Sequence, residues 1–424
     1  MLPSNDPSLI SWVTVDSNSD FPIQNLPFGV FRKQGKKPRV GVAIGDFVLD
    51  LARLQSNGLF IDGRLEEKVF RKSSMNAFLA LGKEKCRWVR ERVSVLLRVE
   101  NKELQGNTIL ADKALVPQKD VEMLLPVKAQ DYTDFYSSIE HATNVGMMFR
   151  DPENALLPNW KHMPVAYHGR ASSIIVSGTD VKRPKGQYKN PGDDLPSFGA
   201  SKRLDFELEM AFITCGQTKL GDSISTREAE DYIFGFTLFN DWSARDIQAW
   251  EYVPLGPFLG KNFGSSMSPW VVTMDALIPF TTHGPIQEPK VLPYLSYEGA
   301  WNFDVRLDVI IKPEGGEENL VTRSNFKHMY WNVLQQLAHH TVNGCNINEG
   351  DIYASGTISG PTSDTYGSML ELSWKGTKPI TLSDGSSRSF INDHDTVIMR
   401  GVANNGNVSL GFGELTTKVI PADE

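Results

Sequence analysis

Residues 131–150 bring two kinds of potentially reactive side chain together, carboxylates and a histidine, with tyrosines and an arginine nearby. The Ser-x-x-Glu spacing of Ser137 and Glu140 is typical of a capping box, so a helix is predicted to begin there with His141 in its first turn. Unpaired N–H groups and the helix dipole disfavour a second proton on His141, which is therefore expected to be neutral and able to accept one. Beside Asp134 it could act as a general base next to a metal ligand. The alternative is a helix-capping acid with a hydrogen-bonded core histidine, and this stretch alone does not decide between them.

Residues 204–213 alternate strictly between polar and apolar side chains, which predicts a β-strand. On such a strand Asp205, Glu207 and Glu209 share one face. Acids this close repel one another, at little cost if the face is open to water. If the face lines a pocket, a cation is needed to neutralise it.

A second apolar run, residues 234–241, predicts a strand that ends in Asp241. If Asp134, Glu207, Glu209 and Asp241 meet, they form a site made only of oxygen ligands. Such a site favours Mg²⁺ or Ca²⁺ over zinc or copper, and the choice between those two depends on cavity size and flexibility.

Further polar groups follow Asp241. Arg245, Gln248 and Tyr252 stand at helical spacing, so a helix would present a guanidinium, an amide and a phenol on one face. These groups can recognise an oxyanion or a carboxylate, although a polar outer stripe would show the same spacing. In the glycine-rich residues 254–265, which are predicted to form a loop, Lys261 is the only charged residue.

Several classes of function are disfavoured. The sequence contains no His-Glu-x-x-His, no G-x-S-x-G and no G-x-G-x-x-G motif, which argues against such a zinc protease, serine hydrolase or dinucleotide enzyme. A net charge of -8 argues against nucleic acid or an anionic membrane as partner. No segment approaches the run of about 18 apolar residues typical of a membrane helix, and no secretory signal is expected. Cys86, Cys215 and Cys345 form no Cys-x-x-Cys pair, which suits a reducing cytoplasm.

The length of 424 residues exceeds one typical core, so two structural units are expected, and 35 glycines with 24 prolines indicate many turns and much β structure. Around residues 28–54, alternating Val40, Val42 and Ile44 followed by Gly45-Asp46 predict a β-hairpin. The apolar residues between 88 and 97 recur at helical spacing and predict an amphipathic helix. We place a boundary near residue 120, which gives units 1–120 and 121–424.

The C-terminal part is predicted to combine a helix with short strands. Residues 324–341 carry apolar side chains at helical spacing and are followed by Asn343-Gly344, so a long helix is expected there. His339 and His340 near its end would complement the helix dipole. Turn signals at residues 360–361, 384–385 and 405–406 then predict a β-roll or barrel-like ending.

Seven motifs in this order resemble the fumarylacetoacetase family over nearly the whole chain. They include Tyr167-His-Gly-Arg170, Asp205-Phe-Glu-Leu-Glu209 and Gly256-Pro-Phe-Leu-Gly-Lys261, and the others are residues 131–150, 240–248, 354–361 and 368–376. The resemblance implies a mainly β fold with some α, in which a small SH3-like β domain precedes a larger mixed β-roll domain, and a homodimer. It also implies metal-dependent hydrolysis of a carbon–carbon bond in the β-diketone 4-fumarylacetoacetate, the last step of tyrosine and phenylalanine catabolism.

The resemblance further implies a role for individual residues. The catalytic set would be His141 as general base, Glu371 as the acid that orients it, and Arg245, Gln248 and Lys261 as oxyanion stabilisers. The substrate would contact Tyr136, Arg150, Tyr167, Tyr252 and Thr357. The surroundings of Mg²⁺ or Ca²⁺ would be Asp134, Glu207, Glu209, Asp241, Lys261, Gly264 and Ser265.

The sequence departs from the expected pattern at a few positions. Ser265 stands where threonine is expected, Asn262 where serine is expected, and Ile139-Glu140 where a more basic pair is expected. Serine keeps the hydroxyl, whereas Glu140 adds a negative charge beside His141. Two other functions remain open: a related acylpyruvate hydrolase or oxo-acid decarboxylase or isomerase, and a non-catalytic protein that binds a cation.

Overall fold

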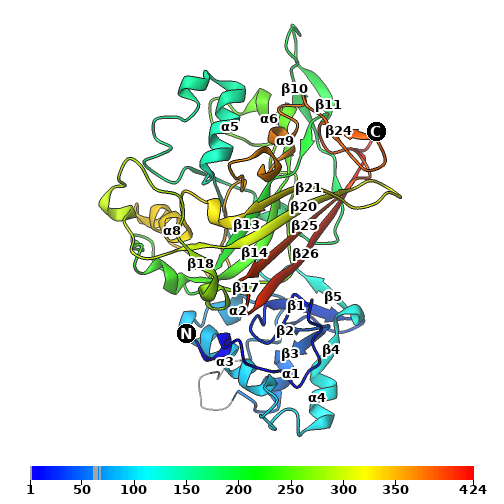
Figure 1. Ribbon diagram of the computed structural model, residues 1–424, viewed down its shortest axis with the longest axis vertical. Helices are drawn as coiled ribbons and strands as arrows, with labels where there is room; N and C mark the ends of the chain where they lie inside the picture. Colours follow the sequence, from blue (N-terminus) through cyan, green and yellow to red (C-terminus); the bar gives the residue numbers. More distant parts are fainter. Residues whose placement is uncertain (1, 61–64, 66–67) are drawn as a thin grey trace.

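The N-terminal unit is built on one antiparallel sheet (Figure 1). The computed structural model describes residues 2–60, 65 and 68–424. Five strands lie in the order β4-β3-β2-β1-β5: β1 Phe28–Lys33, β2 Arg39–Ile44, β3 Phe47–Asp50, β4 Leu115–Pro117 and β5 Val121–Leu124. The predicted hairpin is confirmed, because β2 and β3 pair across Gly45-Asp46 and Gly45 has a φ of 52°, which favours glycine.

Helices cover this sheet, and the longest carries the predicted amphipathic pattern. They are α1 Leu51–Ser56, α2 Asn76–Leu79, α3 Lys83–Leu97 and α4 Thr108–Ala114. On α3, Val89, Val93, Leu96 and Leu97 are fully buried, so the prediction of an amphipathic helix is confirmed.

The C-terminal unit packs two sheets face to face. The first runs β7-β6-β22-β13-β14-β16-β8, with β17 also paired to β14: β6 Tyr132–Phe135, β7 Ala166–His168, β8 Ile174–Val176, β13 Leu208–Thr214, β14 Ile233–Asp241, β16 Ser265–Met267, β17 Val272–Thr273 and β22 Ile352–Ala354. The second runs β21-β20-β25-β26-β9: β9 Val181–Lys182, β20 Val305–Lys312, β21 Asn319–Asn325, β25 Thr396–Asn404 and β26 Ser409–Ile420. Side chains such as Met210, Phe236, Leu307 and Phe412 fill one core between them.

Most strand pairs are antiparallel, but β6 with β22, β8 with β16 and β9 with β26 are parallel, so both sheets are mixed. The shorter pairs are β10 Lys185–Tyr188 with β11 Ser197–Ala200, β12 Leu204–Asp205 with β15 Ser243–Ala244, β18 Thr281–Thr282 with β19 Asn302–Phe303, and β23 Ile380–Thr381 with β24 Ser387–Arg388. The predicted turns lie at Gly385, between β23 and β24, and at Gly406, between β25 and β26. The prediction of a mainly β chain with a smaller unit before a larger one is confirmed.

The predicted helix over residues 324–341 is wrong in its first half. The C-terminal unit contains α5 Ile139–Phe149, α6 Arg245–Glu251, α7 Met274–Leu277, α8 Val333–Thr341 and α9 Met369–Leu372. Residues 319–325 instead pair with β20, and Asn332 begins α8 by accepting hydrogen bonds from the backbone N–H of Leu334 and Gln335. Ladder hydrogen bonds to a neighbouring strand thus outweigh the apolar spacing that suggested a longer helix.

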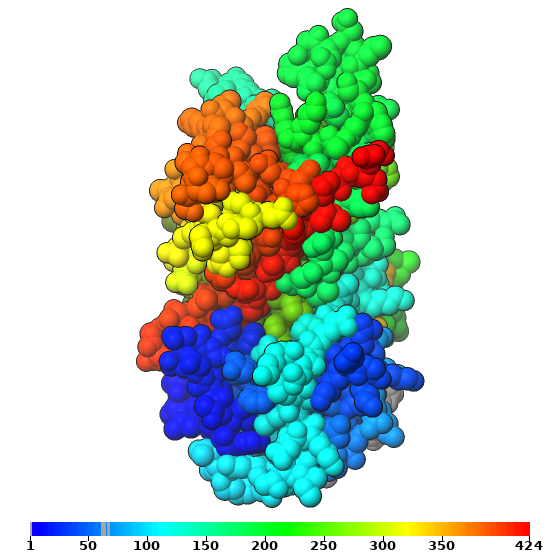
Figure 2. Space-filling view, turned by 90° about the vertical axis from the view of Figure 1, so that its right-hand side faces the viewer, coloured from blue at the N-terminus to red at the C-terminus, as the bar shows by residue number. Residues whose placement is uncertain are grey.

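The two units share a hydrophobic core. Phe28 of β1 and Phe78 of α2 lie with ring centroids 5.4 and 5.8 Å from that of Phe234 on β14. Lys83 also donates a hydrogen bond to the carbonyl of Ile233 at 2.7 Å. Figure 2 shows the N-terminal unit, blue to cyan, in contact with the C-terminal unit above it. The N-terminal unit therefore packs against the first residues of β14, whereas Asp241 lies at the opposite end of that strand.

Candidate active site

Four predicted acids meet where strands of the first sheet end. Asp134 lies on β6, Glu209 on β13 and Asp241 at the end of β14, while Glu207 lies just before β13. The order β6-β22-β13-β14 brings these strands together. Each acid offers one oxygen, and the four oxygens lie within 4.8 Å of one another. All four residues are buried.

Asp205 does not join this cluster. The predicted strand over residues 204–213 is interrupted between β12 and β13, so Asp205 points elsewhere. Its carboxylate accepts hydrogen bonds from the backbone N–H of Met369 at 2.7 Å and Leu370 at 3.0 Å, and from Arg245 Nε at 2.8 Å. Asp205 therefore fixes the start of α9 and one side of Arg245.

Lys261 reaches into the cluster from the glycine-rich loop. Its ammonium group donates to Glu207 Oε2, and to Asp241 Oδ2 at 2.6 Å. Burial alone would lower the pKa of Lys261, but the charges of Asp241 and Glu207 outweigh burial and raise it. Burial alone would raise the pKa of Glu207, and Lys261 and Arg245 outweigh that and lower it. Lys261 thus neutralises only part of the cluster.

The remaining acids, Asp134 and Glu209, form no salt bridge with any residue that the structure describes. Asp134 Oδ1 and Glu209 Oε1 are buried and have no hydrogen-bond partner among the described residues. Burial, and then the neighbouring carboxylates, raise the pKa of both groups well above its usual value. A divalent cation would supply the missing positive charge, and a donor set made only of oxygens fits Mg²⁺ or Ca²⁺.

His141 and Glu371 form a buried pair. His141 Nδ1 lies 2.7 Å from Glu371 Oε2, although the two residues are 230 positions apart. His141 stands in the first turn of α5, as predicted, but the capping residue is Ser138, whose Oγ accepts from the His141 N–H at 3.2 Å. The predicted cap at Ser137 is wrong, because the Ser137 hydroxyl accepts a hydrogen bond from Gln336 instead. After Lys261 and Arg245, a protonated His141 would also lower the pKa of Glu207, so the pair lies within electrostatic reach of the acidic cluster.

The oxyanion residues predicted on α6 are held in a chain of hydrogen bonds. Arg245 donates through Nη2 to Glu207 at 2.8 Å and through Nη1 to Gln248 Oε1 at 3.2 Å. Because Gln248 accepts through its oxygen, its amide N–H groups point away from Arg245. Charge on Asp205 and Glu207 outweighs burial and raises the pKa of Arg245, so the guanidinium keeps its charge.

The predicted substrate residues divide into an inner and an outer group. The ring centroids of Tyr136 and His141 lie 5.2 Å apart, and Tyr167 donates to Asp241 Oδ2 at 2.7 Å. The hydroxyl of Thr357 is buried and has no hydrogen-bond partner in the part of the chain that the structure describes. Arg150 and Tyr252 are exposed, and Arg150 donates to the carbonyl of Ala155 at 2.6 Å. Tyr136 thus borders the histidine and Tyr167 borders the acids, while the outer group lies at the protein surface.

The predicted loop residues lie against Asp241. Ser265 begins β16 and donates through Oγ to Asp241 Oδ1 at 2.9 Å. Gly264 precedes it, and a Cβ there would approach Val181 Cγ2 at 3.2 Å.

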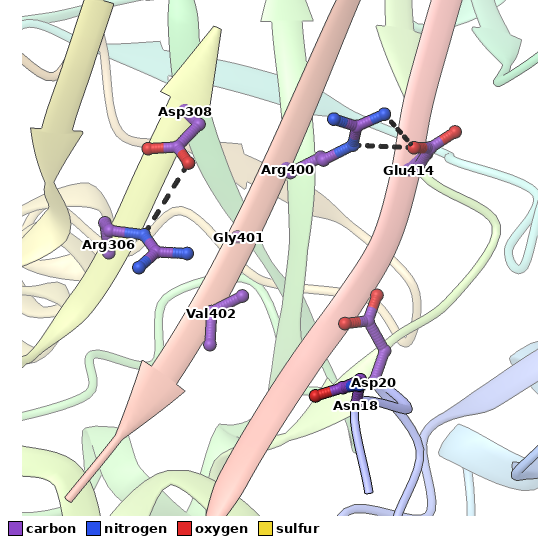
Figure 3. Close-up of a pocket in the computed structure, with 8 residues that line it drawn as sticks. All are labelled: Asn18, Asp20, Arg306, Asp308, Arg400, Gly401, Val402 and Glu414. Atoms are coloured by element: carbon purple, nitrogen blue, oxygen red, sulfur yellow. Dashed lines mark hydrogen bonds and ion pairs between the residues drawn. The ribbon is translucent and has the colours of Figure 1, made fainter. Parts of the chain in front are cut away.

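A separate groove lies between the N-terminal segment and the second sheet (Figure 3). It has a volume of about 320 Å³ and its lining includes Asn18, Asp20, Arg306 and Arg400. Arg400 is paired with Glu414 at 2.6 Å, and Arg306 lies 3.6 Å from Asp308. Because its arginines are already paired, this groove is a weaker candidate for catalysis than the buried acids and His141.

Comparison with known proteins identifies the family. Residues 24–126 match the family model described as "Fumarylacetoacetase N-terminal", and residues 131–420 match "Fumarylacetoacetate (FAA) hydrolase C-terminal". The chain is 53% identical over 423 residues to the fumarylacetoacetase of Dictyostelium discoideum, covering 98% of this chain and 99% of that one. It belongs to the fumarylacetoacetase family.

Other relatives agree with this membership. The Homo sapiens fumarylacetoacetase is 52% identical over 417 residues, covering 97% of this chain and 99% of that one. A solved fumarylacetoacetate hydrolase from Exiguobacterium antarcticum shares the fold, with a TM-score of 0.53 and 16% identity over 93% of this chain and 99% of that one. In the described part of the chain, every helix is too short or too polar to span a membrane.

The two fumarylacetoacetase-family models divide the chain between residues 126 and 131. Strand β5, residues 121–124, pairs with β1 and so lies in the N-terminal sheet. The domain limits of 1–120 and 121–424 stay a prediction, and the sheet pairing changes between Leu124 and Tyr132.

Three residues that the sequence analysis missed surround Glu371 of this family member. Asn144 Nδ2 donates to Oε1 at 2.9 Å, Ser359 Oγ lies 2.9 Å from both carboxylate oxygens, and Ser368 Oγ donates to Oε2 at 2.8 Å. Burial alone would raise the pKa of Glu371, but His141 and these hydrogen bonds lower it. Two signals were available: Ser368 and Glu371 have capping-box spacing, and Asn144 lies three residues after His141 on the same helix.

Proposed function

We propose that this chain hydrolyses a carbon–carbon bond of 4-fumarylacetoacetate to give fumarate and acetoacetate, the last step of tyrosine and phenylalanine catabolism. The observation that carries the proposal is the 2.7 Å contact between His141 and Glu371 beside four buried acids. The identity of 53% to a fumarylacetoacetase over 98% of the chain supports it.

His141 is the general base. Glu371 holds the ring at Nδ1, so the other ring nitrogen is left to remove a proton from water. The water attacks the keto carbon of the fumaryl group, and the bond from this carbon to the neighbouring methylene then breaks. The methylene carbon takes up a proton, and the products are fumarate and acetoacetate.

Arg245, Gln248 and Lys261 stabilise the oxyanion that forms during this attack. Arg245 is fixed by Asp205 and Glu207, and Lys261 by Glu207 and Asp241, so neither charge has to be reorganised during the reaction. A donor of this kind contributes about 3 kcal/mol to the transition state.

Asp134, Glu207, Glu209 and Asp241 hold Mg²⁺ or Ca²⁺, with Lys261, Gly264 and Ser265 around them. The unpaired oxygens of Asp134 and Glu209 support this assignment. When bound, the cation supplies positive charge that stabilises the anionic leaving group.

The remaining predicted residues bind the substrate. The unpaired hydroxyl of Thr357 and the aromatic side chains of Tyr136 and Tyr167 border the reacting centre. Arg150 and Tyr252, which are exposed, suit a terminal carboxylate.

The active form is a homodimer in the cytoplasm. The family resemblance supports the dimer. The free state of Cys86, Cys215 and Cys345 is consistent with a reducing compartment.

Product analysis separates this function from related chemistries of the same fold. Purified protein with Mg²⁺ is incubated separately with fumarylacetoacetate, an acylpyruvate and oxaloacetate, and the products are followed by proton NMR. We expect fumarate and acetoacetate from the first, at a kcat/KM at least about 100-fold above that for the other two. Faster turnover of the acylpyruvate or of oxaloacetate would contradict the proposal.

A further inference from the structure

Tyr132, at the start of β6, has a buried hydroxyl that no part of the mechanism uses. The residue is 3% exposed, and its hydroxyl has no hydrogen-bond partner among the described residues. Buried hydroxyl groups are nearly always hydrogen-bonded to protein or to ordered water, so this one requires an explanation.

The ring of Tyr132 is fixed in place. Its centroid lies 5.2 Å from that of Phe239. Gly169 also lies against the ring, where a Cβ would come within 2.1 Å of Tyr132 Cδ1, so only glycine permits this packing. The hydroxyl therefore cannot swing away to find a partner elsewhere.

Tyr132 lies on the same face of β6 as Asp134, because side chains two apart along a strand point the same way. Phe239, whose ring packs against that of Tyr132, stands directly opposite Glu209 of β13 and two residues before Asp241 on β14, so all three proposed ligands are its neighbours on this face of the sheet. The Tyr167 hydroxyl is already bonded to Asp241, whereas Asp134 Oδ1 and Glu209 Oε1 are unpaired. Three unpaired polar atoms therefore belong to one small buried region.

We propose that the Tyr132 hydroxyl binds a water molecule that is itself a ligand of the cation in the acidic cluster. This inference rests on the cation of the proposed function. A cation alone would satisfy the carboxylate oxygens but would not give the phenol a hydrogen-bond partner. A water ligand does both, and polar groups behind the ligands of a metal commonly orient them in this way.

The proposal predicts a difference between the two cations. Mg²⁺ demands near-ideal octahedral geometry and keeps several water ligands, whereas Ca²⁺ accepts irregular sets of protein oxygens. Tyr132→Phe removes only the hydroxyl. We expect it to weaken Mg²⁺ binding about tenfold, and Ca²⁺ binding less than about threefold.

Isothermal titration calorimetry with MgCl₂ and CaCl₂ tests this on the full chain after removal of cations with EDTA. Tyr330→Phe is the matched control, because the Tyr330 hydroxyl accepts a hydrogen bond from the Glu288 N–H and lies outside the cluster. Selective loss of Mg²⁺ affinity in Tyr132→Phe alone would support the proposal. Unchanged Mg²⁺ affinity, or an equal loss for both cations, would overturn it.

Two further results are informative. Because the hydroxyl has no hydrogen-bond partner within the described ranges of the chain, cation-free Tyr132→Phe should melt within about 2 °C of the cation-free wild type. A much lower melting temperature would mean that the hydroxyl has a structural role in the protein itself, and would also overturn the proposal. If the wild type binds neither cation, the cation assignment of the proposed function fails, whereas equal Mg²⁺ binding by both proteins refutes only the role of Tyr132.

Discussion

The carboxylate of Glu371 receives hydrogen bonds from His141, Asn144, Ser359 and Ser368. This full set of donors fixes its orientation and favours its charged form. An ionised carboxylate can only accept hydrogen bonds, so Nδ1 of His141 must carry the proton that it donates to Glu371. Nε2 is then unprotonated, which is the tautomer that a general base needs.

Replacing the acid should therefore affect chemistry more than binding. In Glu371→Gln the amide no longer supplies a negative charge and can present N–H groups to His141. We expect kcat to fall by about 10²- to 10⁴-fold while KM changes less than about threefold. Steady-state kinetics measure both values, with Glu153→Gln, an exposed residue of the 3₁₀ turn after α5, as the control. A wild-type kcat in Glu371→Gln would rule out the pair as the catalytic base.

Ser265, which stands where the family pattern has threonine, is a departure that directly contacts one of the four acids. Its hydroxyl donates to Asp241 Oδ1, and threonine could make the same bond. Ser265→Thr should keep Mg²⁺ affinity within about twofold, whereas Ser265→Ala should weaken it about tenfold. Calorimetric titration of both variants measures the effect, and equal affinities in all three proteins would mean that this hydrogen bond does not support the cation site.

At the scale of elements, α8 is tied to the first sheet by a half-buried histidine. His340, near the end of α8, has Nδ1 3.1 Å from the hydroxyl of Tyr353 on β22. The pKa of His340 is lowered to about 4, mainly by burial. The neighbouring His168 and His339 lower this pKa further, whereas Asp131 raises it. The predicted dipole role of His340 thus competes with a strong preference for the neutral form.

This depressed pKa gives a pH dependence with a defined sign. The unfolded chain takes up a proton on His340 near the ordinary pKa of about 6.5, whereas the folded chain does so only near 4. Folded stability from this group is therefore present above pH 6.5 and is lost as the pH falls towards 4, by about 2 kcal/mol at pH 5. Urea denaturation at pH 7 and pH 5 should show that His340→Gln loses about that much less stability than the wild type. An equal loss in both would contradict this, and exposed His162→Gln serves as the control.

The sequence predicted helices and strands best where interactions between residues close in the sequence determine the structure. The hairpin at Gly45 follows from alternation and turn chemistry, and both are local. The false helix over residues 324–341 arose because Phe326 and Tyr330 fit helical spacing although the preceding residues pair with β20. The true start was marked by Asn332 and Gln335, which form a capping box.

At the scale of the molecule, the shared core predicts that the two units unfold together. Phe28, Phe78 and Phe234 belong to one buried cluster that crosses between the units. Phe78→Ala should cost about 3 to 5 kcal/mol, and calorimetry of the wild type should show one cooperative transition. Two well-separated transitions, with Phe78→Ala affecting only the first, would show that the shared core contributes little.

The site could be predicted only in part from local sequence. Glu207 and Glu209 were expected on one strand face, because strand periodicity is local. The pairing of His141 with Glu371 spans 230 residues, and only the family resemblance linked them. Neither local periodicity nor the family resemblance predicted the hydrogen-bond donors around Glu371. Asn144, Ser359 and Ser368 are common polar residues that only the fold brings together.

The most direct test of the central claim is the loss of ultraviolet absorbance of fumarylacetoacetate on addition of the purified protein. It is measured with EDTA, with Mg²⁺ and with Ca²⁺, for the wild type and His141→Ala. We expect the absorbance to fall only when a cation and an intact His141 are both present, with a rate at least about 100-fold lower in the variant. Absorbance that stays constant for the wild type with bound cation, or that falls equally fast in His141→Ala, would contradict it.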